Sequence, residues 1–366
     1  MKIALVHEFL NTWGGGEYVL KVFSEIYPEA PIYVINYDQK IIDEFLPGKK
    51  IIPSFLQSFP GMPKSFKYWL PFMPRAIESF DLSGYDIVLS DSSAYAKGAI
   101  AKGKTKHICY LHTPTRYLWS DRDSYIASAP IPLPLIGQPI VKLIVKFLQK
   151  WDLKAAKRPD YLIANAEYIA ERTRKYYKRN PNKVLFPPVD CSRFKISKEI
   201  GDYFLVVGRQ EPYKRTDLAI QAANVLGIKL RIVGGGTKLD ALKKIAGPTV
   251  EFTGRVSDGE LVELYSNCKA FIFPPLEDAG ITPLEAMASG RPVIAYGEGG
   301  ALESVVAGVT GEFFKEQTVE SLVEVLKNFD PNKYDPQKIR AHAEHFDIEI
   351  FKEKITNVVR TVDKVA

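Results

Sequence analysis

The sequence predicts an α/β protein in which helices cover parallel β-sheets. Short apolar runs, typical of strands buried on both faces, alternate with stretches whose pattern favours helices. A chain of 366 residues is too long for one ordinary core, so we expect two domains. The expected strands are 2–6, 32–35, 87–89, 108–111 and 161–164 in the first half, and 203–207, 229–233, 250–253, 270–273 and 292–295 in the second.

Helices are expected between these strands and at the end of the chain, at 17–27, 217–225, 258–268 and 346–362 among others. The segment 180–195 mixes polar residues with two prolines and shows no period, as a linker does. The chain therefore divides into an expected first domain at 1–185, a second domain at 186–345 and a C-terminal helix at 346–366.

The composition is that of an ordinary globular protein, with 46% hydrophobic and 25% charged residues. The net charge of +6 permits anionic partners but does not by itself indicate nucleic acid. Three distant cysteines, without metal or redox spacing, fit buried thiols in a reducing cytoplasm. The first apolar run stops at His7 and Glu8, which predicts a strand rather than a signal peptide. The sequence contains no run of about eighteen apolar residues, so we expect no transmembrane helix.

Two glutamates in the second half are the most informative residues. Glu277 lies on a loop after an apolar run, and Glu285 lies in the first turn of an expected helix with Thr282 as N-cap and Pro283 next. Free N–H groups at such a helix start can hold an anion. Two carboxylates beside an anion site suit a ligand that is part sugar and part phosphate.

Each glutamate also has a plainer interpretation. The pattern Thr282-Pro-Leu-Glu285 is a capping box, in which Glu285 would only bond the backbone of its own helix. Glu277 would be a solvated loop carboxylate.

The segment 277–295 resembles the Glu-x7-Glu signature of family-four retaining glycosyltransferases, which have the GT-B fold. The resemblance implies two facing Rossmann-like domains with the ligand between them, and a last helix that crosses back to the first domain. It implies that Glu277 contacts the donor sugar, that Glu285 holds the ribose, and that the amides at Gly280, Ile281 and Thr282 face the diphosphate. Ala279 stands where the family often has an aromatic residue.

A glycine loop, Gly14-Gly15-Gly16, precedes the first expected helix. Glycines at a helix start let backbone N–H groups approach phosphate, although a tight turn has the same composition. The spacing is neither the dinucleotide fingerprint nor a Walker motif. The loop resembles the one that faces the donor diphosphate in family-four enzymes, which implies that Gly15 and Gly16 bind the donor.

Arg209 and Lys214 follow the expected strand 203–207. Fixed cations stabilise the charge that develops on a departing diphosphate, and the pair is similar to the Gly-Arg…Lys pair of the family. A solvated basic loop is the alternative.

His112 follows the expected strand 108–111, at the ligand edge of a parallel sheet. The stretch from His112 to Trp119 resembles the His-x-Pro-x-Arg-Tyr-x-Trp segment of bacterial mannosyltransferase-like members. This implies that His112 meets the donor sugar and that Arg116 helps to bind phosphate or acceptor. A structural histidine is the alternative.

Weaker signals complete the expected site. The resemblance implies that Val256 borders the nucleobase, although it could only pack, and Gly234–Gly236 could form a close-packing turn. Asp121 and Asp123 match the Asp-x-Asp metal motif of another transferase class, but two acids at this spacing are common. We expect no bound metal and no cofactor, because GT-B enzymes generally work without metal.

Basic residues interleave with large apolar ones at 140–154, at 55–80 and beside the apolar segment 131–136. In 140–154 the lysines are expected on one stripe and the apolar side chains largely elsewhere. This suits an anionic membrane surface, and a solvated lysine face is equally compatible.

The resulting hypothesis is a retaining, metal-independent hexosyltransferase that takes mannose from GDP-mannose to a glycan or lipid-linked acceptor in polysaccharide or lipopolysaccharide biosynthesis. It would be cytoplasmic, with peripheral attachment to the membrane's inner face as an open alternative. A UDP-sugar transferase, a sugar-nucleotide epimerase and a non-catalytic nucleotide-sugar-binding partner remain open alternatives.

Overall fold

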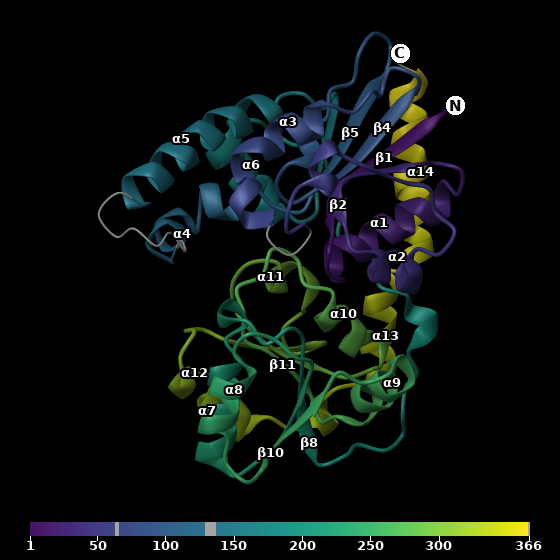
Figure 1. Ribbon diagram of the computed structural model, residues 1–366. Helices are drawn as coiled ribbons and strands as arrows, with labels where there is room; N and C mark the ends of the chain where they lie inside the picture. Colours follow the sequence, from purple (N-terminus) through teal and green to yellow (C-terminus); the bar gives the residue numbers. More distant parts are fainter. Residues whose placement is uncertain (63–65, 129–136, 365–366) are drawn as a thin grey trace. The chain divides into compact units, whose positions relative to one another are not determined.

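The computed structural model describes residues 1–62, 66–128 and 137–364, and within them the chain forms two compact units. The first unit consists of Met1–Phe186 with Lys352–Ala366, and the second of Pro187–Phe351. The returning segment thus begins at Lys352, within the last helix, rather than at 346. Figure 1 labels the elements of both units.

The first unit is built on a parallel sheet with the strand order β3-β2-β1-β4-β5-β6-β7. The order reverses between β1 and β4, which is the switch point where α/β proteins bind ligands. The described strands are β1 (Ile3–Leu10), β2 (Ile32–Tyr37), β3 (Ile51–Pro53), β4 (Ile87–Ser92), β5 (Lys106–Leu111), β6 (Tyr161–Ala164) and β7 (Lys183–Val184).

Helices connect these strands, and the apolar faces of α3 (Met73–Glu78) and α5 (Gly137–Ala155) form one core with β1, β2 and β4. Long helices lie where the sequence has amphipathic stretches, and short 3-10 turns fill the loops. They are α1 (Gly15–Ile26), α2 (Gln39–Phe45), η1 (Phe55–Ser58), η2 (Phe66–Phe72), α3 (Met73–Glu78), η3 (Ala96–Gly98), η4 (Arg116–Leu118), α4 (Arg122–Ser128), α5 (Gly137–Ala155) and α6 (Glu167–Tyr177).

The second unit has a parallel sheet with the order β10-β9-β8-β11-β12-β13 and a switch point between β8 and β11. Its strands are β8 (Tyr203–Val207), β9 (Lys229–Val233), β10 (Val250–Gly254), β11 (Phe271–Phe273), β12 (Val293–Tyr296) and β13 (Gly311–Phe314). Its helical segments are η5 (Cys191–Arg193), η6 (Pro212–Lys214), α7 (Thr216–Leu226), α8 (Leu239–Ile245), α9 (Asp258–Asn267), α10 (Thr282–Ala288), α11 (Ala301–Ser304), α12 (Val319–Asn328), η7 (Pro331–Lys333) and α13 (Pro336–Glu344).

The last helix, α14 (Ile348–Lys364), returns the chain to the first unit. Ile355, Val358 and Val359 are buried, and Lys352 Nζ lies 3.2 Å from Glu25 Oε2 of α1. The first unit is therefore assembled from both ends of the chain.

One detail of the sequence analysis needs correction. The strand β1 does not stop at His7 and Glu8 but continues to Leu10, and both polar side chains are buried within it. The three cysteines are buried and free, as their spacing predicts. Burial raises the pKa of the Cys109 thiol to about 12.

Candidate active site

The glycine loop of the first unit leads from β1 into α1. Gly14 is the N-cap in an extended conformation and Gly15 is the first helical residue, and no side chain caps the first amides. A Cβ added to Gly16 would lie 3.6 Å from His112 Nε2 and 3.9 Å from His7 Cε1. The loop therefore brings the helix start next to His112.

His112 directly follows β5 and forms a cluster with residues of the neighbouring strands β4 and β1. Its Nε2 contacts Oδ1 of Asp91, whose Oδ2 lies 2.9 Å from His7 Nδ1. The contact with His7 is an ion pair rather than a directed hydrogen bond. Asp91 has no exposed surface and the His112 side chain is 13% exposed. One carboxylate thus joins two imidazoles at the switch point of the sheet.

The charges in this cluster shift the pKa values of its two histidines and of Asp91. Burial lowers the pKa of His112, but the charge and the hydrogen bond of Asp91 outweigh burial and raise this pKa above its ordinary value. For His7, burial is outweighed by Asp91 and Glu17, and the pKa is raised well above its ordinary value. Burial would raise the pKa of Asp91, but His112 and His7 lower it on balance.

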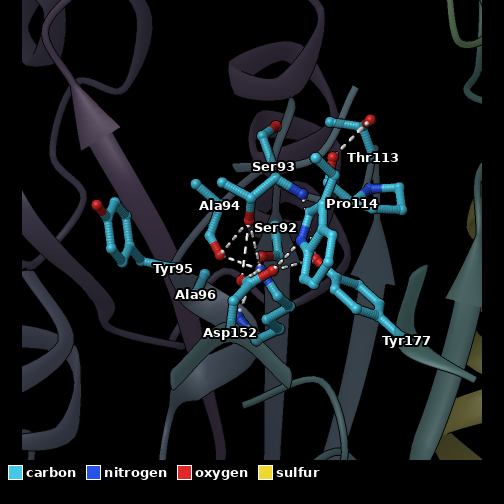
Figure 2. A network of polar contacts seen from close by, with 12 residues as sticks. Ser92, Ser93, Ala94, Tyr95, Ala96, Thr113, Pro114, Asp152 and Tyr177 are labelled. Carbon is cyan, nitrogen blue, oxygen red and sulfur yellow. Dashed lines mark hydrogen bonds and ion pairs between the residues drawn. The ribbon is translucent and has the colours of Figure 1, made fainter. Parts of the chain in front are cut away.

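Glu8 organises the segment that follows β4. Its Oε1 accepts hydrogen bonds from Ser92 Oγ at 2.9 Å and from the backbone N–H groups of residues 93–96 at 2.8–3.0 Å. A buried carboxylate surrounded by backbone donors is well stabilised. Figure 2 shows how closely Ser92, Ser93, Ala94 and Ala96 gather here. Glu8 therefore fixes the loop beside Asp91.

A second buried network, also in Figure 2, holds the segment 112–119. Lys97 Nζ lies 2.7 Å from Asp152 Oδ1, with both side chains almost fully buried. Asp152 also accepts hydrogen bonds from Thr115 Oγ1 at 2.9 Å, Trp119 Nε1 at 2.8 Å and Tyr177 OH at 2.8 Å. These contacts fix the loop that carries His112 and Arg116.

Arg116 contacts an acid of the Asp-x-Asp pair. Its Nε lies 3.1 Å from Asp121 Oδ2, and Arg122 Nε lies 2.9 Å from Asp123 Oδ1. Each carboxylate thus has an arginine partner. No group of three or more His, Cys, Asp or Glu residues suited to a metal ion occurs among the residues described.

In the second unit, the loops after β8 and β11 meet at the sheet's switch point. Lys214 Nζ lies 2.5 Å from Glu277 Oε1, and the side chains are only 22% and 17% exposed. The side chain of Arg209 is exposed and makes no hydrogen bond or ion pair with any residue in the described ranges. Gly208, Arg209 and Lys214 line a small pocket together with β11. The structure thus brings together the expected residues Arg209, Lys214 and Glu277.

The glycines after β9 support this loop. Gly234 has φ +107°, and a Cβ there would lie 2.2 Å from the carbonyl oxygen of Gly208. A Cβ on Gly236 would lie 2.5 Å from the carbonyl oxygen of Gln210. Only glycine permits this approach, so Gly234–Gly236 form the close-packing turn that the sequence suggests.

The helix α10 begins one residue earlier than expected. Thr282 is its first residue and Ile281 is the N-cap, and no side chain caps the helix. Gly280 has φ +88°, and a Cβ there would lie 2.9 Å from Phe273 Cζ. The turn before α10 therefore requires glycine, and it leaves the first amides of the helix without a side-chain partner.

Glu285 does not form the capping box. Its Oε2 instead accepts a hydrogen bond from Tyr265 OH at 2.8 Å. Burial raises the pKa of Glu285 above its ordinary value, although Tyr265 and the charge of Arg193 act in the other direction. The plainer interpretation of Glu285 is wrong, since no side chain caps α10 and the carboxylate bonds to Tyr265 of α9 instead.

The remaining expected residue of this unit, Val256, is half-buried just beyond β10. A wider hollow of the unit lies between β13 and α12 and contains none of the expected site residues. Its lining includes Glu312, Glu316, Glu320 and Glu324 together with Lys315 and Lys333.

The helix α5 has a mixed surface. Val141, Val145 and Leu148 are buried, whereas Leu143 is 69% exposed and Phe147 is 53% exposed. Lys142, Lys146, Lys150 and Lys154 are exposed as well. Elsewhere, Phe55 and Phe72 are exposed. The segment 131–136 and Lys64 lie outside the described residues. No helix that the structure describes is long and apolar enough to span a bilayer.

The sequence analysis did not predict that Asp91 contacts His112, that His7 contacts Asp91, or that Tyr265 contacts Glu285. Asp91 and His7 lie near the carboxyl ends of β4 and β1, so the rule that ligand residues follow parallel strands could have identified them. Tyr265 lies inside α9, where its sequence gives no sign of a polar role.

Comparison with known proteins gives consistent matches along the chain. The family model "Glycosyltransferase Family 4" matches residues 32–193, and "Glycosyl transferases group 1" matches residues 192–346. Alpha-1,3/1,6-mannosyltransferase ALG2 of Homo sapiens is 25% identical over 320 residues, which are 75% of this chain and 73% of that protein.

A second relative is the GDP-mannose-dependent alpha-(1-6)-phosphatidylinositol monomannoside mannosyltransferase of Mycobacterium tuberculosis, 32% identical over 163 residues. That alignment covers 38% of this chain and 42% of the mycobacterial protein, less than half of either. Among solved structures, Anabaena Alr3699/HepE in complex with UDP and glucose superimposes with a TM-score of 0.75. It shares 17% identity and covers 98% of this chain and 99% of its own, which shows the fold.

Adjacent family models thus account for the chain from residue 32 to residue 346, and the fold agrees with them. The chain belongs to the family-four type of glycosyltransferases and has the GT-B fold.

Proposed function

We propose that the protein is a retaining hexosyltransferase that moves mannose from GDP-mannose to a hydroxyl of a glycan or lipid-linked glycan. The observation that carries this proposal is the Lys214–Glu277 pair beside the free cation of Arg209. A carboxylate can accept hydrogen bonds from sugar hydroxyls, and the two cations can stabilise charge on a leaving diphosphate. The choice of GDP-mannose follows the names of the human and mycobacterial relatives.

The roles of the other residues follow the same chemistry. Glu285, whose carboxylate is hydrogen-bonded to Tyr265, would accept hydrogen bonds from the ribose hydroxyls. Val256 would border the base. The amides at Gly15 and Gly16 in the first unit, and at Gly280, Ile281 and Thr282 in the second, would donate to diphosphate oxygens. His112 would contact the sugar, and Arg116 would bind a phosphate or acceptor oxygen.

The proposed mechanism is attack on the same face from which the diphosphate leaves. A double displacement would need a carboxylate free to attack the anomeric carbon. Glu277 is engaged by Lys214 and Glu285 by Tyr265, which favours binding roles for both. In same-face attack, the leaving phosphate oxygen accepts the proton of the acceptor hydroxyl as the new glycosidic bond forms. Anomeric configuration of the product, read by NMR, tests retention directly.

We also propose that the reaction needs no metal and no cofactor. The Asp-x-Asp carboxylates are each engaged by an arginine, which supports this proposal. Transfer that is abolished by a chelator and restored by magnesium or manganese would overturn it.

The first experiment is calorimetric titration with GDP, UDP and ADP in the presence of chelator. Preferential binding of GDP is expected, followed by transfer from GDP-mannose to a mannoside acceptor. Preferential binding of UDP would favour a UDP-hexose donor, for which the UDP-bound structure of HepE is the supporting observation. Conversion of the donor without acceptor would identify an epimerase. Nucleotide binding without any turnover would identify a non-catalytic partner.

For the acceptor, we propose a lipid-linked glycan reached by peripheral attachment to an anionic membrane surface, on the cytoplasmic side. On α5 the exposed Leu143 and Phe147 lie among exposed lysines, a combination that suits an anionic bilayer. Vesicles containing phosphatidylglycerol should bind the protein at low salt. Leu143→Ser with Phe147→Ser should abolish sedimentation with these vesicles, and unchanged binding would contradict the proposal.

A further inference from the structure

The bridging position of Asp91 determines which nitrogen of His112 is available to a ligand. Nε2 of His112 is engaged by Asp91 Oδ1, so this nitrogen carries a proton. Nδ1 forms no hydrogen bond with any residue in 1–62, 66–128 or 137–364. The side chain keeps some exposure, and it lies against Gly16 of the glycine loop. Nδ1 is therefore the nitrogen that can meet a ligand.

The charge of the ring decides what Nδ1 offers. In a neutral imidazole with its proton on Nε2, Nδ1 has a lone pair and accepts hydrogen bonds. In the imidazolium, Nδ1 carries a proton and donates. The two states present opposite chemistry to the same ligand atom, so the surroundings of the ring set its function.

Those surroundings are anionic. From β4, Asp91 contacts the ring directly; from β1, Glu8 adds negative charge and His7 adds positive charge. From α1, Glu17 Oε1 lies 3.9 Å from His7 Nε2 and offsets the charge of His7. From β5, the neutral ring of Tyr110 packs edge-on against His112 with its centroid at 5.2 Å. Three carboxylates thus face two imidazoles, an arrangement that stabilises protonated rings.

We propose that Asp91 is a positioning residue for His112: it fixes the ring through Nε2 and holds it as an imidazolium, so that Nδ1–H donates to an oxygen of the bound sugar nucleotide. His7 shares the carboxylate of Asp91 and supports its ionised state. An imidazolium has no lone pair with which to remove a proton, so His112 is an electrophilic hydrogen-bond donor and not a general base. The identity of the ligand rests on the proposed function, whereas the state of the ring does not.

The state of the ring can be measured without any ligand. The protein has five histidines, so a titration of protein labelled in its histidine rings, followed by NMR, resolves each of them. The spectrum of His112→Gln assigns the resonance of His112. This ring should titrate above the ordinary histidine value of about 6.5, and in Asp91→Asn its midpoint should fall by roughly 1–3 units. A neutral His112 at pH 7 in the unmodified protein would overturn the proposal, and so would an unchanged midpoint in Asp91→Asn.

Kinetics provide the second readout. In Asp91→Asn the alkaline limb of the pH profile of kcat/KM should move to lower pH, and activity should recover toward that of the unmodified protein on acidification. A loss of the same size at every pH would mean that Asp91 only supports the fold, and would contradict the proposal. Asp86→Asn is the matched control, because Asp86 is an exposed carboxylate just before the other end of β4.

The two proposals fail separately. If the unmodified protein shows neither nucleotide binding nor transfer, the proposed function is wrong, and the NMR titration still decides the state of His112. If transfer is intact and His112 is neutral at pH 7, the proposed function stands and the role of Asp91 is rejected.

Discussion

Lys214 and Glu277 are 63 positions apart in the sequence, yet their side chains form an ion pair with Nζ 2.5 Å from Oε1. The pair joins the loop after β8 to the loop after β11, across the switch point of the second sheet. Glu277, whose carboxylate would bind the donor sugar, is thus held by Lys214, the cation that would stabilise the departing diphosphate.

Replacement of this lysine tests the pair. Lys214→Ala should lower kcat/KM for transfer by about 10²–10³-fold, because a fixed cation near the departing diphosphate is lost. Glu277→Ala should lower it as well, with an unchanged circular dichroism spectrum. The control is Lys229→Ala, since Lys229 forms an exposed pair with Asp202 whose contribution should be small. Full turnover in both site variants would refute the assignment.

Tyr265→Phe removes one hydroxyl that contacts Glu285. Without this donor, the half-buried carboxylate loses a hydrogen bond that orients it, so nucleotide affinity should fall about tenfold, in line with a hydrogen bond to a charged group. Calorimetry with the preferred nucleotide measures the change. The weakening should be larger at acidic pH, because loss of the Tyr265 hydrogen bond raises the pKa of Glu285 further and favours its neutral form. Equal affinities of the two proteins at every pH would show that Glu285 does not depend on Tyr265.

Gly280→Ala places a side chain where φ is +88° and where Phe273 leaves too little space. The left-handed conformation alone should cost about 1–2 kcal/mol of unfolding free energy, and the displaced turn should weaken nucleotide binding. Denaturant unfolding and calorimetry measure the two effects. Gly259→Ala, inside α9 with no atom within 4 Å of the new Cβ, is the control and should be neutral or stabilising. Matching behaviour of the two variants would contradict this account of Gly280.

His107 should make the protein sensitive to acid. Burial, with the charges of Arg179 and Arg158, lowers the pKa of His107 to about 3, so the folded protein keeps this ring neutral while the unfolded chain protonates it below about 6.5. Between these values the unfolded state binds more protons, and stability should fall as pH falls, by up to about 1.4 kcal/mol per pH unit.

The substitution His107→Gln should make the free energy of unfolding depend less steeply on pH, since glutamine does not titrate. Glutamine can still bond Ser90, whose Oγ lies 2.7 Å from His107 Nε2. Urea unfolding at several pH values from 4 to 7 compares the two proteins. The prediction fails if the free energy of unfolding changes with pH equally steeply in both proteins.

The strands that the sequence predicts are those with continuous apolar runs, and β8 and β9 were predicted to the residue. The missed strands depend on tertiary contacts. β7 has two residues within the expected linker, and β3 ends at Pro53. β13 begins at Gly311, where a Cβ would lie 1.9 Å from the carbonyl oxygen of Val293. Glycine weakens a strand pattern in sequence, but here it permits the close pairing with β12.

The site residues were predictable where they follow strands, and their partners were not. His112 and Glu277 each follow a predicted strand, and the helix of Glu285 was predicted within one residue of its start. Asp91 is 21 positions from His112, so their contact depends on the adjacent pairing of β4 and β5. The capping-box pattern was misleading because Tyr265, from a different helix, offers Glu285 a better donor than its own helix start.

The return of α14 to the first unit has a consequence for synthesis of the chain. The residues that bury Ile355, Val358 and Val359 belong to a unit whose sheet leaves the ribosome long before this helix does. Through the translation of the whole second unit, the nascent first unit keeps an uncovered apolar surface on which chaperones can act. A ribosome stalled at residue 351 should therefore display the first unit in an unfinished, protease-sensitive form, and the last thirteen described residues complete a fold begun at the first strand.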